Sequence, residues 1–251
     1  MKFLRVRQGK KIRNPIPFRK IIPNMVTSGN VLCGMFSIIL TFNGRFVPAA
    51  WMVFFAVIFD GLDGKMARIL GGGTHFGLEY DSLADVISFG VAPAMLMYAA
   101  FLKGFGGIVG AIIACFFALC VALRLARFNV VHMPGPFQGL PCPAGGLFVS
   151  SFVLAGLHLE TEPLMIAVVI VATGFLMISS VPYANLKKLT KASANRKKCF
   201  LVLGVLTLGF VLLHEATPLA FFVVYIVSGL LRFDWEKWLL LRTEEAAEEH
   251  S

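Results

Sequence analysis

The chain has 251 residues, of which 57% are hydrophobic and only 15% are charged, and its mean hydropathy is +0.79. Several apolar runs are long enough to cross a hydrocarbon core of roughly 30 Å, which excludes an ordinary soluble domain and predicts a polytopic membrane protein. The net charge of +9 arises from basic residues at the boundaries of these runs, so we expect contact with membrane lipids and no nucleic-acid binding.

Residues 1–24 form a basic N-terminal segment ahead of the first apolar run. A full-length span follows it without a small-residue cleavage site, so we expect the segment to stay attached and to lie in the cytoplasm. Apolar residues stand beside Arg19 and Lys20 between Ile16 and Ile22, which favours either a juxtamembrane amphipathic helix or a basic tail without regular structure.

The hydropathy pattern predicts an all-α membrane bundle of about eight transmembrane helices over residues 25–232. The orientation follows from lysine and arginine, because alternation from a cytoplasmic N-terminus leaves little more than Arg45 and Lys103 among the basic residues of the opposite side. An even number of spans places the C-terminal tail, residues 233–251, in the cytoplasm as well. The predicted spans are 25–43, 46–68, 81–102, 105–127, 142–159, 163–182, 199–214 and 217–232.

Four carboxylates lie within the second and third predicted spans. Asp60 and Asp63 are three residues apart and Asp81 and Asp85 are four apart, so each pair lies on one face of its helix. Charged residues in membrane helices cost free energy and are functional candidates by default. Four like charges at one place repel one another unless a cation neutralises them, and oxygen ligands suit Mg²⁺ or Mn²⁺. The sequence therefore predicts a divalent-metal site.

The residues beside these carboxylates favour the approach of a bulky anion. Gly64 and Ala67 remove side-chain bulk from the same helix face, and Arg68 at its end is suited to binding a phosphate group. Gly77, one turn before Asp81, opens the facing helix. We therefore predict that the site binds a nucleotide diphosphate.

Other polar residues near the site have two interpretations each. Thr74 follows the glycine triplet 71–73, which lacks the Gly-Lys-Ser/Thr continuation of a phosphate-binding loop, and Thr74 either contacts phosphate or caps the next helix. Asn24, Thr27 and Asn30 on the first span either contact the cytidine or phosphates, or form hydrogen bonds between helices.

The spacing resembles the signature of the CDP-alcohol phosphotransferase family, Asp-x2-Asp-Gly-x2-Ala-Arg-x8-Gly-x3-Asp-x3-Asp. The resemblance implies a helical membrane enzyme whose cytoplasm-facing site binds the CDP group of a liponucleotide through two metal ions and releases CMP. It also implies that the four aspartates are metal ligands and that Asp85 is the general base for the attacking hydroxyl. The eight fixed positions are Asp60, Asp63, Gly64, Ala67, Arg68, Gly77, Asp81 and Asp85.

Further segments are similar to the type II phosphatidylserine synthase branch of this family. The similarity implies CDP-diacylglycerol as donor, L-serine as acceptor, phosphatidylserine and CMP as products, and a homodimer. One departure is Cys142, which stands between two prolines where an aliphatic residue is more usual. The segments are Ile22–Gly34, Asp81–Ala94, Arg124–Asn129, Gly139–Gly146 and Met177–Lys188.

An acceptor that carries a carboxylate requires a nearby cation. Arg124 and Arg127, at the cytoplasmic end of the fourth predicted span, are candidates, and Lys187 is a weaker one. The alternative is that these residues only anchor their helices among the headgroups.

Three other functions fit part of the pattern. A sister enzyme that uses glycerol 3-phosphate or an inositol phosphate needs additional phosphate-binding arginines. A membrane prenyltransferase needs a second aspartate-rich motif, but Asp234 is the only aspartate after Asp85. An ion-coupled transporter is disfavoured because the motif has no inverted duplicate.

Overall fold

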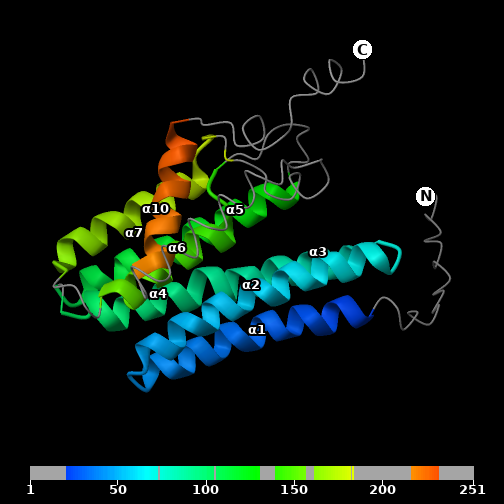
Figure 1. Cartoon of the computed structure of the whole chain (residues 1–251), viewed down its shortest axis with the longest axis horizontal. Helices are drawn as coiled ribbons and strands as arrows, with labels where there is room; N and C mark the ends of the chain where they lie inside the picture. Colours follow the sequence, from blue (N-terminus) through cyan, green and yellow to red (C-terminus); the bar gives the residue numbers. More distant parts are fainter. Residues whose placement is uncertain are drawn as a thin grey trace, which may run out of the picture.

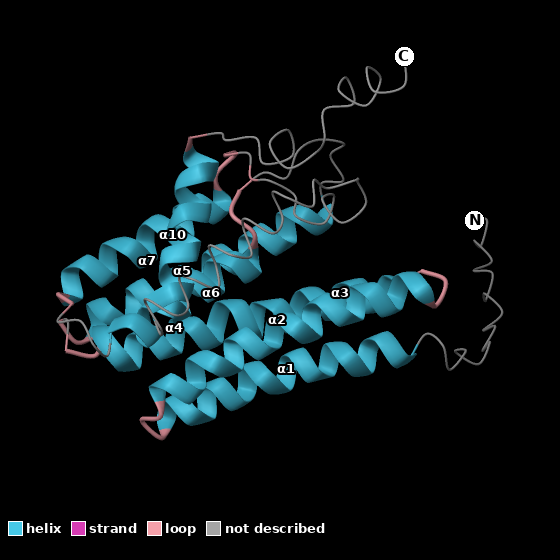
Figure 2. Ribbon diagram, in the orientation of Figure 1, coloured by secondary structure: helices cyan, strands magenta, loops and turns pink. Residues whose placement is uncertain are grey.

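The computed structural model describes residues 21–72, 74–104, 106–130, 139–156, 161–181, 183 and 216–231. Every regular element within these residues is helical (Figure 2). The all-α membrane bundle predicted from the sequence is confirmed. The basic segment up to residue 20, the predicted span 199–214, Lys187 and the tail from residue 233 lie outside the described residues.

Within the described residues, four helical stretches are long and apolar enough to cross a membrane. The third is continuous from His75 to Leu102 but changes between α-helical and π-helical hydrogen bonding along its length. The elements are α1 (Ile21–Phe42), α2 (Phe46–Ile69), α3 (His75–Asp85) with its continuations η2 (Val86–Val91), α4 (Ala92–Met97) and η3 (Tyr98–Leu102), and α5 (Ile108–Val130).

Three shorter apolar helices complete the described part of the bundle: α6 (Cys142–Gly156), α7 (Pro163–Ile178) and α10 (Thr217–Leu230). α6 is the central one, since it contacts α2, α4, α5, α7 and α10 and its residues from Gly145 to Ala155 are all buried. Figure 1 shows α1, α2 and α3 side by side, with α6, α7 and α10 on the other side of the molecule.

Seven of the eight predicted spans coincide with described helices, and the main difference is the start of the third. It begins at His75, six residues before the predicted boundary, because Thr74 caps it: the Thr74 Oγ1 accepts a hydrogen bond of 2.9 Å from the Gly77 backbone N–H. Asp81 consequently lies inside the helix, one turn beyond Gly77. The fourth begins at Ile108, since Gly106 and Gly107 adopt left-handed backbone conformations before it.

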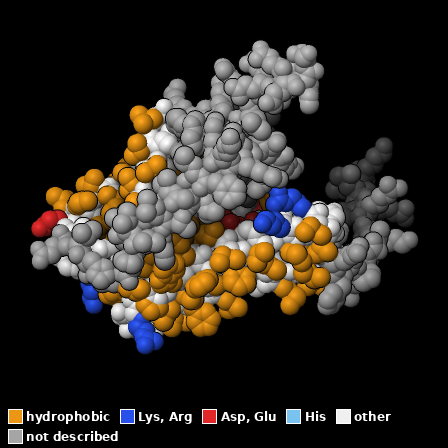
Figure 3. Space-filling model, viewed as in Figure 1, with side chains coloured by type: hydrophobic (Ala, Val, Ile, Leu, Met, Phe, Trp, Pro, Cys, Tyr) orange, Lys and Arg blue, Asp and Glu red, His pale blue; other side chains and the backbone are white. Residues whose placement is uncertain are grey.

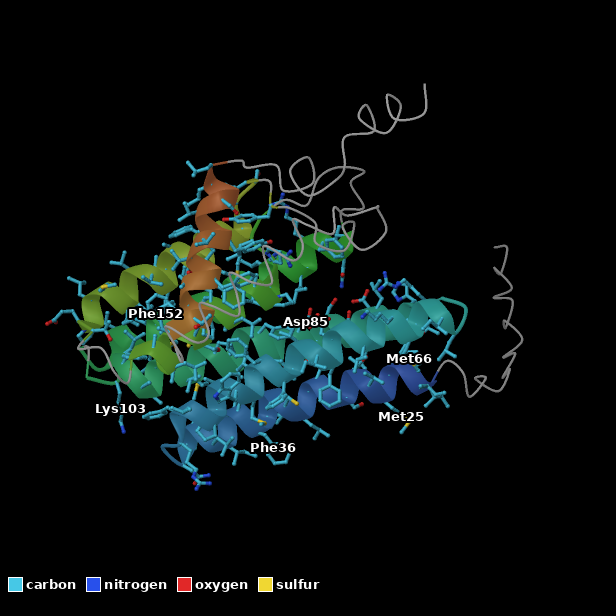
Figure 4. All side chains as sticks on the ribbon, viewed as in Figure 1. Met25, Phe36, Met66, Asp85, Lys103 and Phe152 are labelled. Atoms are coloured by element: carbon cyan, nitrogen blue, oxygen red, sulfur yellow. The ribbon has the colours of Figure 1, made fainter. Side chains whose placement is uncertain are left out.

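The outer surface of the long helices is apolar. Large hydrophobic side chains such as Phe36, Ile39 and Ile112 are exposed, and Figure 3 shows hydrophobic side chains along much of the visible face. Such a surface fits lipid rather than water. Lys103 lies at the opposite end of the bundle from Met25 and Met66 (Figure 4).

Candidate active site

α2 and α3 bring three of the predicted metal ligands together. One carboxylate oxygen from each of Asp60, Asp63 and Asp81 lies within 4.8 Å of the other two. The turn between the helices is short because Gly71 and Gly72 adopt φ angles of +101° and +103°, which side chains other than glycine rarely tolerate. The antiparallel helices therefore carry their aspartates at similar depths. We call these three residues the acidic group.

The acidic group fits a hard divalent cation. Asp63 is buried, with 5% of its surface exposed, and Asp60 and Asp81 are half-buried. Like charges held this close at the edge of a hydrocarbon core are unfavourable without a compensating positive charge. Carboxylate oxygens are the ligands that Mg²⁺ and Mn²⁺ prefer. The donor atoms and their spacing thus agree with the predicted chemistry.

Asp85 lies beside the acidic group but is held differently. Its side chain is buried, and its Oδ1 accepts a hydrogen bond of 3.2 Å from the Asn30 Nδ2 of α1. It is close enough to Asp60, Asp81 and Asp63 to interact with them electrostatically. In Figure 4, several side-chain oxygens lie near Asp85, between α3 and α5 in this view. The four predicted aspartates therefore lie in one region of the bundle, but only Asp60, Asp63 and Asp81 have carboxylate oxygens within 4.8 Å of one another.

The face of α2 that leads away from the acidic group is open. Gly64 is exposed, and a Cβ atom added there would have no neighbour within 4 Å. Ala67 is half-buried and Arg68 is exposed in the last turn of α2, where the Arg68 Nε donates a hydrogen bond of 2.9 Å to the Gly64 carbonyl oxygen. Space and a positive charge thus occur together beside the carboxylates.

The close approach of α1 to the start of α3 accounts for other predicted residues. A Cβ atom on Gly77 would lie 2.9 Å from the Asn24 Oδ1 and 3.1 Å from the Thr74 Oγ1, so the space beside Gly77 is already used by these side chains. Thr27 is buried, and its hydroxyl donates to the Pro23 carbonyl oxygen in the same helix. In this structure these residues cap a helix or form contacts within and between helices, and their contact with a substrate stays a prediction.

The two predicted acceptor arginines have different surroundings. Arg124 is half-buried, and its Nη1 donates a hydrogen bond of 3.1 Å to the Sγ of Cys142, the first residue of α6. Cys142 in turn is close enough to Asp85 and Asp60 to interact with them electrostatically. Arg127 is exposed, and its Nη1 donates to the Ile178 carbonyl oxygen at the end of α7. Arg124 is therefore linked through Cys142 to the neighbourhood of these aspartates.

Two tyrosines that the sequence did not single out lie near Arg124. Tyr183 is buried and its ring packs on Tyr225 of α10 with centroids 5.7 Å apart, and Tyr225 interacts electrostatically with Arg124. The Tyr183 hydroxyl has no hydrogen-bond partner among the described residues, and burial raises the pKa of this phenol. We call Arg124, Cys142, Tyr183 and Tyr225 the arginine junction. No helical periodicity marks Tyr183, and its position within the segment Met177–Lys188 is the one sequence signal that could have found it.

Comparison with known proteins agrees with this geometry. Residues 20–146 match the family described as CDP-alcohol phosphatidyltransferase. The chain is 39% identical over 236 residues to the CDP-diacylglycerol–serine O-phosphatidyltransferase of Helicobacter pylori, covering 90% of this chain and 94% of that protein. It is 40% identical over 178 residues to the archaetidylserine synthase of Methanothermobacter thermautotrophicus, covering 69% of this chain and 73% of that protein.

Among solved structures, the chain is similar to the phosphatidylinositol phosphate synthase of Mycobacterium tuberculosis with CDP-DAG bound. The TM-score is 0.45 and the sequence identity 21%, and the match covers 64% of this chain and 80% of that one. The same enzyme in complex with manganese and citrate gives the same values apart from a coverage of 78% of its chain.

The chain belongs to the CDP-alcohol phosphatidyltransferase family. It is therefore a membrane-embedded transferase of phospholipid synthesis, as its signature predicted. Membership in this family decides against the prenyltransferase and transporter alternatives.

Proposed function

We propose that this enzyme transfers the phosphatidyl group of CDP-diacylglycerol to L-serine, giving phosphatidylserine and CMP. The observation that carries the proposal is the convergence of the acidic group with the buried Asp85. The acceptor is supported by the relatives, because both the Helicobacter pylori protein and the archaeal synthase have serine in their names.

The resident cofactor we propose is Mg²⁺ or Mn²⁺, with two ions held by Asp60, Asp63, Asp81 and Asp85. The carboxylate oxygens of Asp60, Asp63 and Asp81, within 4.8 Å of one another, support three of these ligands, and the electrostatic interaction of Asp85 with them supports the fourth. When bound, the ions neutralise charge on the diphosphate and on the departing CMP.

Asp85 is the proposed general base. The serine hydroxyl oxygen attacks the phosphorus that carries the diacylglycerol, and its proton passes to the Asp85 carboxylate as the new phosphorus–oxygen bond forms. The phosphorus–oxygen bond to CMP breaks, and CMP leaves with the electron pair. A serine hydroxyl is a weak nucleophile at neutral pH, so a carboxylate positioned beside it lowers the barrier.

The nucleotide end of the donor is assigned to the open face of α2. Gly64 and Ala67 leave room for the diphosphate, and the Arg68 guanidinium adds a positive charge. Thr74, Gly77 and Asn24 belong to the adjoining α1–α3 contact, and Thr27 follows Asn24 on α1. All four are proposed to border the same bound group.

The acceptor end is assigned to the arginine junction. The Arg124 guanidinium is the proposed partner of the serine carboxylate, because Cys142 links it to the neighbourhood of Asp85. Arg127 is a second candidate cation, although its Nη1 already donates to Ile178. Lys187 completes the proposed set and lies outside the described residues.

The proposed setting is the cytoplasmic membrane, with both termini and the active site on the cytoplasmic side and the enzyme acting as a homodimer. Residues 1–24 and 233–251 are the proposed cytoplasmic segments on either side of a membrane domain over 25–232. The support for this orientation is the distribution of lysine and arginine along the sequence, and the homodimer is proposed from the family resemblance alone.

An acceptor screen tests this function. Purified enzyme with CDP-diacylglycerol and Mg²⁺ or Mn²⁺ receives serine, glycerol 3-phosphate or inositol phosphate separately, and CMP release is measured. We expect release with serine, and a loss of roughly 10²-fold or more in the Asp85→Asn enzyme. Turnover with another acceptor and none with serine contradicts the assignment, and wild-type turnover by Asp85→Asn contradicts the mechanism.

A further inference from the structure

Asn30 of α1 is enclosed in the bundle beside Asp85. It is fully buried, and its Nδ2 donates the hydrogen bond of 3.2 Å to the Asp85 Oδ1. The Asn30 Oδ1 is also buried and has no hydrogen-bond partner within the described residues. The bond to Asp85 is therefore the one hydrogen bond that the described structure gives this amide.

A second hydrogen bond fixes the backbone of Asn30 against the helix that carries Asp85. The Ser88 Oγ donates a hydrogen bond of 2.8 Å to the Asn30 carbonyl oxygen. Ser88 lies three residues after Asp85, within the π-helical turn Val86–Val91. π-helical turns frequently accompany functional sites, because the extra residue changes the direction of nearby side chains.

The helices approach closely at this level because α1 has a glycine there. A Cβ atom on Gly34, one turn after Asn30, would lie 2.5 Å from the Ser88 Oγ and 2.9 Å from the Ser88 Cα. No larger residue fits at Gly34 without moving η2, the continuation of α3 that carries Ser88. Asn30, Gly34 and Ser88 thus fix the position of α1 relative to Asp85.

We propose that Asn30 is a positioning residue for Asp85 rather than a contact of the nucleotide. By holding Oδ1, Asn30 restricts rotation of the carboxylate and leaves Oδ2 to accept the proton of the acceptor hydroxyl. Ser88 supports this arrangement by holding the Asn30 backbone. The proposal rests on the proposed role of Asp85 as general base, and it changes the role predicted for Asn30 from substrate binding to orientation of the base.

The test compares Asn30→Ala and Ser88→Ala with a matched control, Ser37→Ala. Ser37 is a buried serine of α1 whose Oγ also donates a hydrogen bond of 2.8 Å to a backbone carbonyl of another helix, that of Ala49, but it does not contact Asp85 or Asn30. All variants are assayed as full-length enzyme for CMP release, for KM with CDP-diacylglycerol, for Mn²⁺ binding and for thermal stability.

We expect Asn30→Ala, assayed at saturating Mn²⁺ because Asp85 is also a proposed metal ligand, to lower kcat by roughly 10- to 100-fold, with KM for CDP-diacylglycerol within about twofold of the wild type. Ser88→Ala should lower kcat less, and Ser37→Ala should keep the wild-type kcat although it loses an equivalent bond. If KM rises more than kcat falls, Asn30 contacts the nucleotide. If all three variants lose kcat in proportion to stability, Asn30 is merely structural. Either result overturns the proposal.

A double variant separates this inference from the proposed mechanism. If Asn30 acts through Asp85, Asn30→Ala combined with Asp85→Asn is no slower than Asp85→Asn alone, whereas independent roles give additive losses. If Asp85→Asn lowers kcat but Asn30→Ala keeps the wild-type kcat, only the positioning role is refuted. If Asp85→Asn keeps the wild-type kcat, the role of Asp85 as general base is refuted. Should Asn30→Ala fail to fold, Asn30→Ser supplies the same comparison.

Discussion

The acidic group and the arginine junction are assembled over different distances along the chain. Asp60, Asp63 and Asp81 come from two helices joined by one tight turn, so the period of the helix and the glycines of the turn suffice to bring them together. Arg124 instead meets Cys142 from another helix, and Tyr183 and Tyr225 come from still later segments. Local spacing thus determines the side assigned to the metal, whereas tertiary packing determines the side assigned to the acceptor.

Of the changes that test this comparison, a substitution in the acidic group should reduce activity the most. Asp63→Asn should reduce CMP release by roughly 10²- to 10³-fold, because it removes a buried ligand of the proposed divalent cation. Glu79→Gln is the matched control, since Glu79 is an exposed carboxylate on α3 that bonds Asn129 and not the acidic group. Equal losses in both variants would mean that net negative charge, rather than this geometry, matters.

Removing divalent cations should affect the same side of the site. We expect EDTA to abolish CMP release in the wild-type enzyme and added Mn²⁺ or Mg²⁺ to restore it, because the like charges of the acidic group need a counter-charge to bind a diphosphate. Mn²⁺ binding, followed by electron paramagnetic resonance, should weaken in Asp63→Asn and stay unchanged in Glu79→Gln. Full activity in EDTA after dialysis would contradict the metal assignment.

Arg124→Gln should act on the acceptor and not on the donor. Loss of charged hydrogen bonds worth about 1.5–3 kcal/mol predicts a KM for serine that is roughly 10- to 100-fold higher, with a small change in KM for CDP-diacylglycerol. Lys103→Gln removes a positive charge at the opposite end of the bundle and is the control. If KM for CDP-diacylglycerol rises instead, Arg124 belongs to the donor site, and the division between the two sides is wrong.

The smallest effect is expected at the contact between α3 and α5. The Asn129 Nδ2 donates hydrogen bonds to the Glu79 Oε2 and the Ser82 Oγ. These bonds join α3, which carries Asp81, to α5, which carries Arg124. Asn129→Ala should lower the free energy of unfolding by about 1 kcal/mol and leave kcat within about twofold, because these groups are partly solvated. Thermal denaturation and CMP release measure the two quantities. A large loss of kcat would show that the relative position of α3 and α5 controls the chemistry.

The sequence by itself determined the membrane class, the approximate limits of seven described helices and the four aspartates. These features depend on hydropathy and on the spacing of residues along a helix, both of which are local. The start of α3 was missed by six residues because the hydropathy of its first turns is low, and the Thr74 cap that begins the helix was one of two interpretations of that residue.

Tertiary structure alone decided how the remaining residues are used. It separated Arg124, which bonds Cys142, from Arg127, which bonds the end of α7, although both lie in the same segment of the sequence. It also directed Asn30 to Asp85 and brought Tyr183 onto Tyr225. Such contacts join residues far apart in the chain, and they depend on the rotation and depth of packed helices, which no spacing within a single helix encodes.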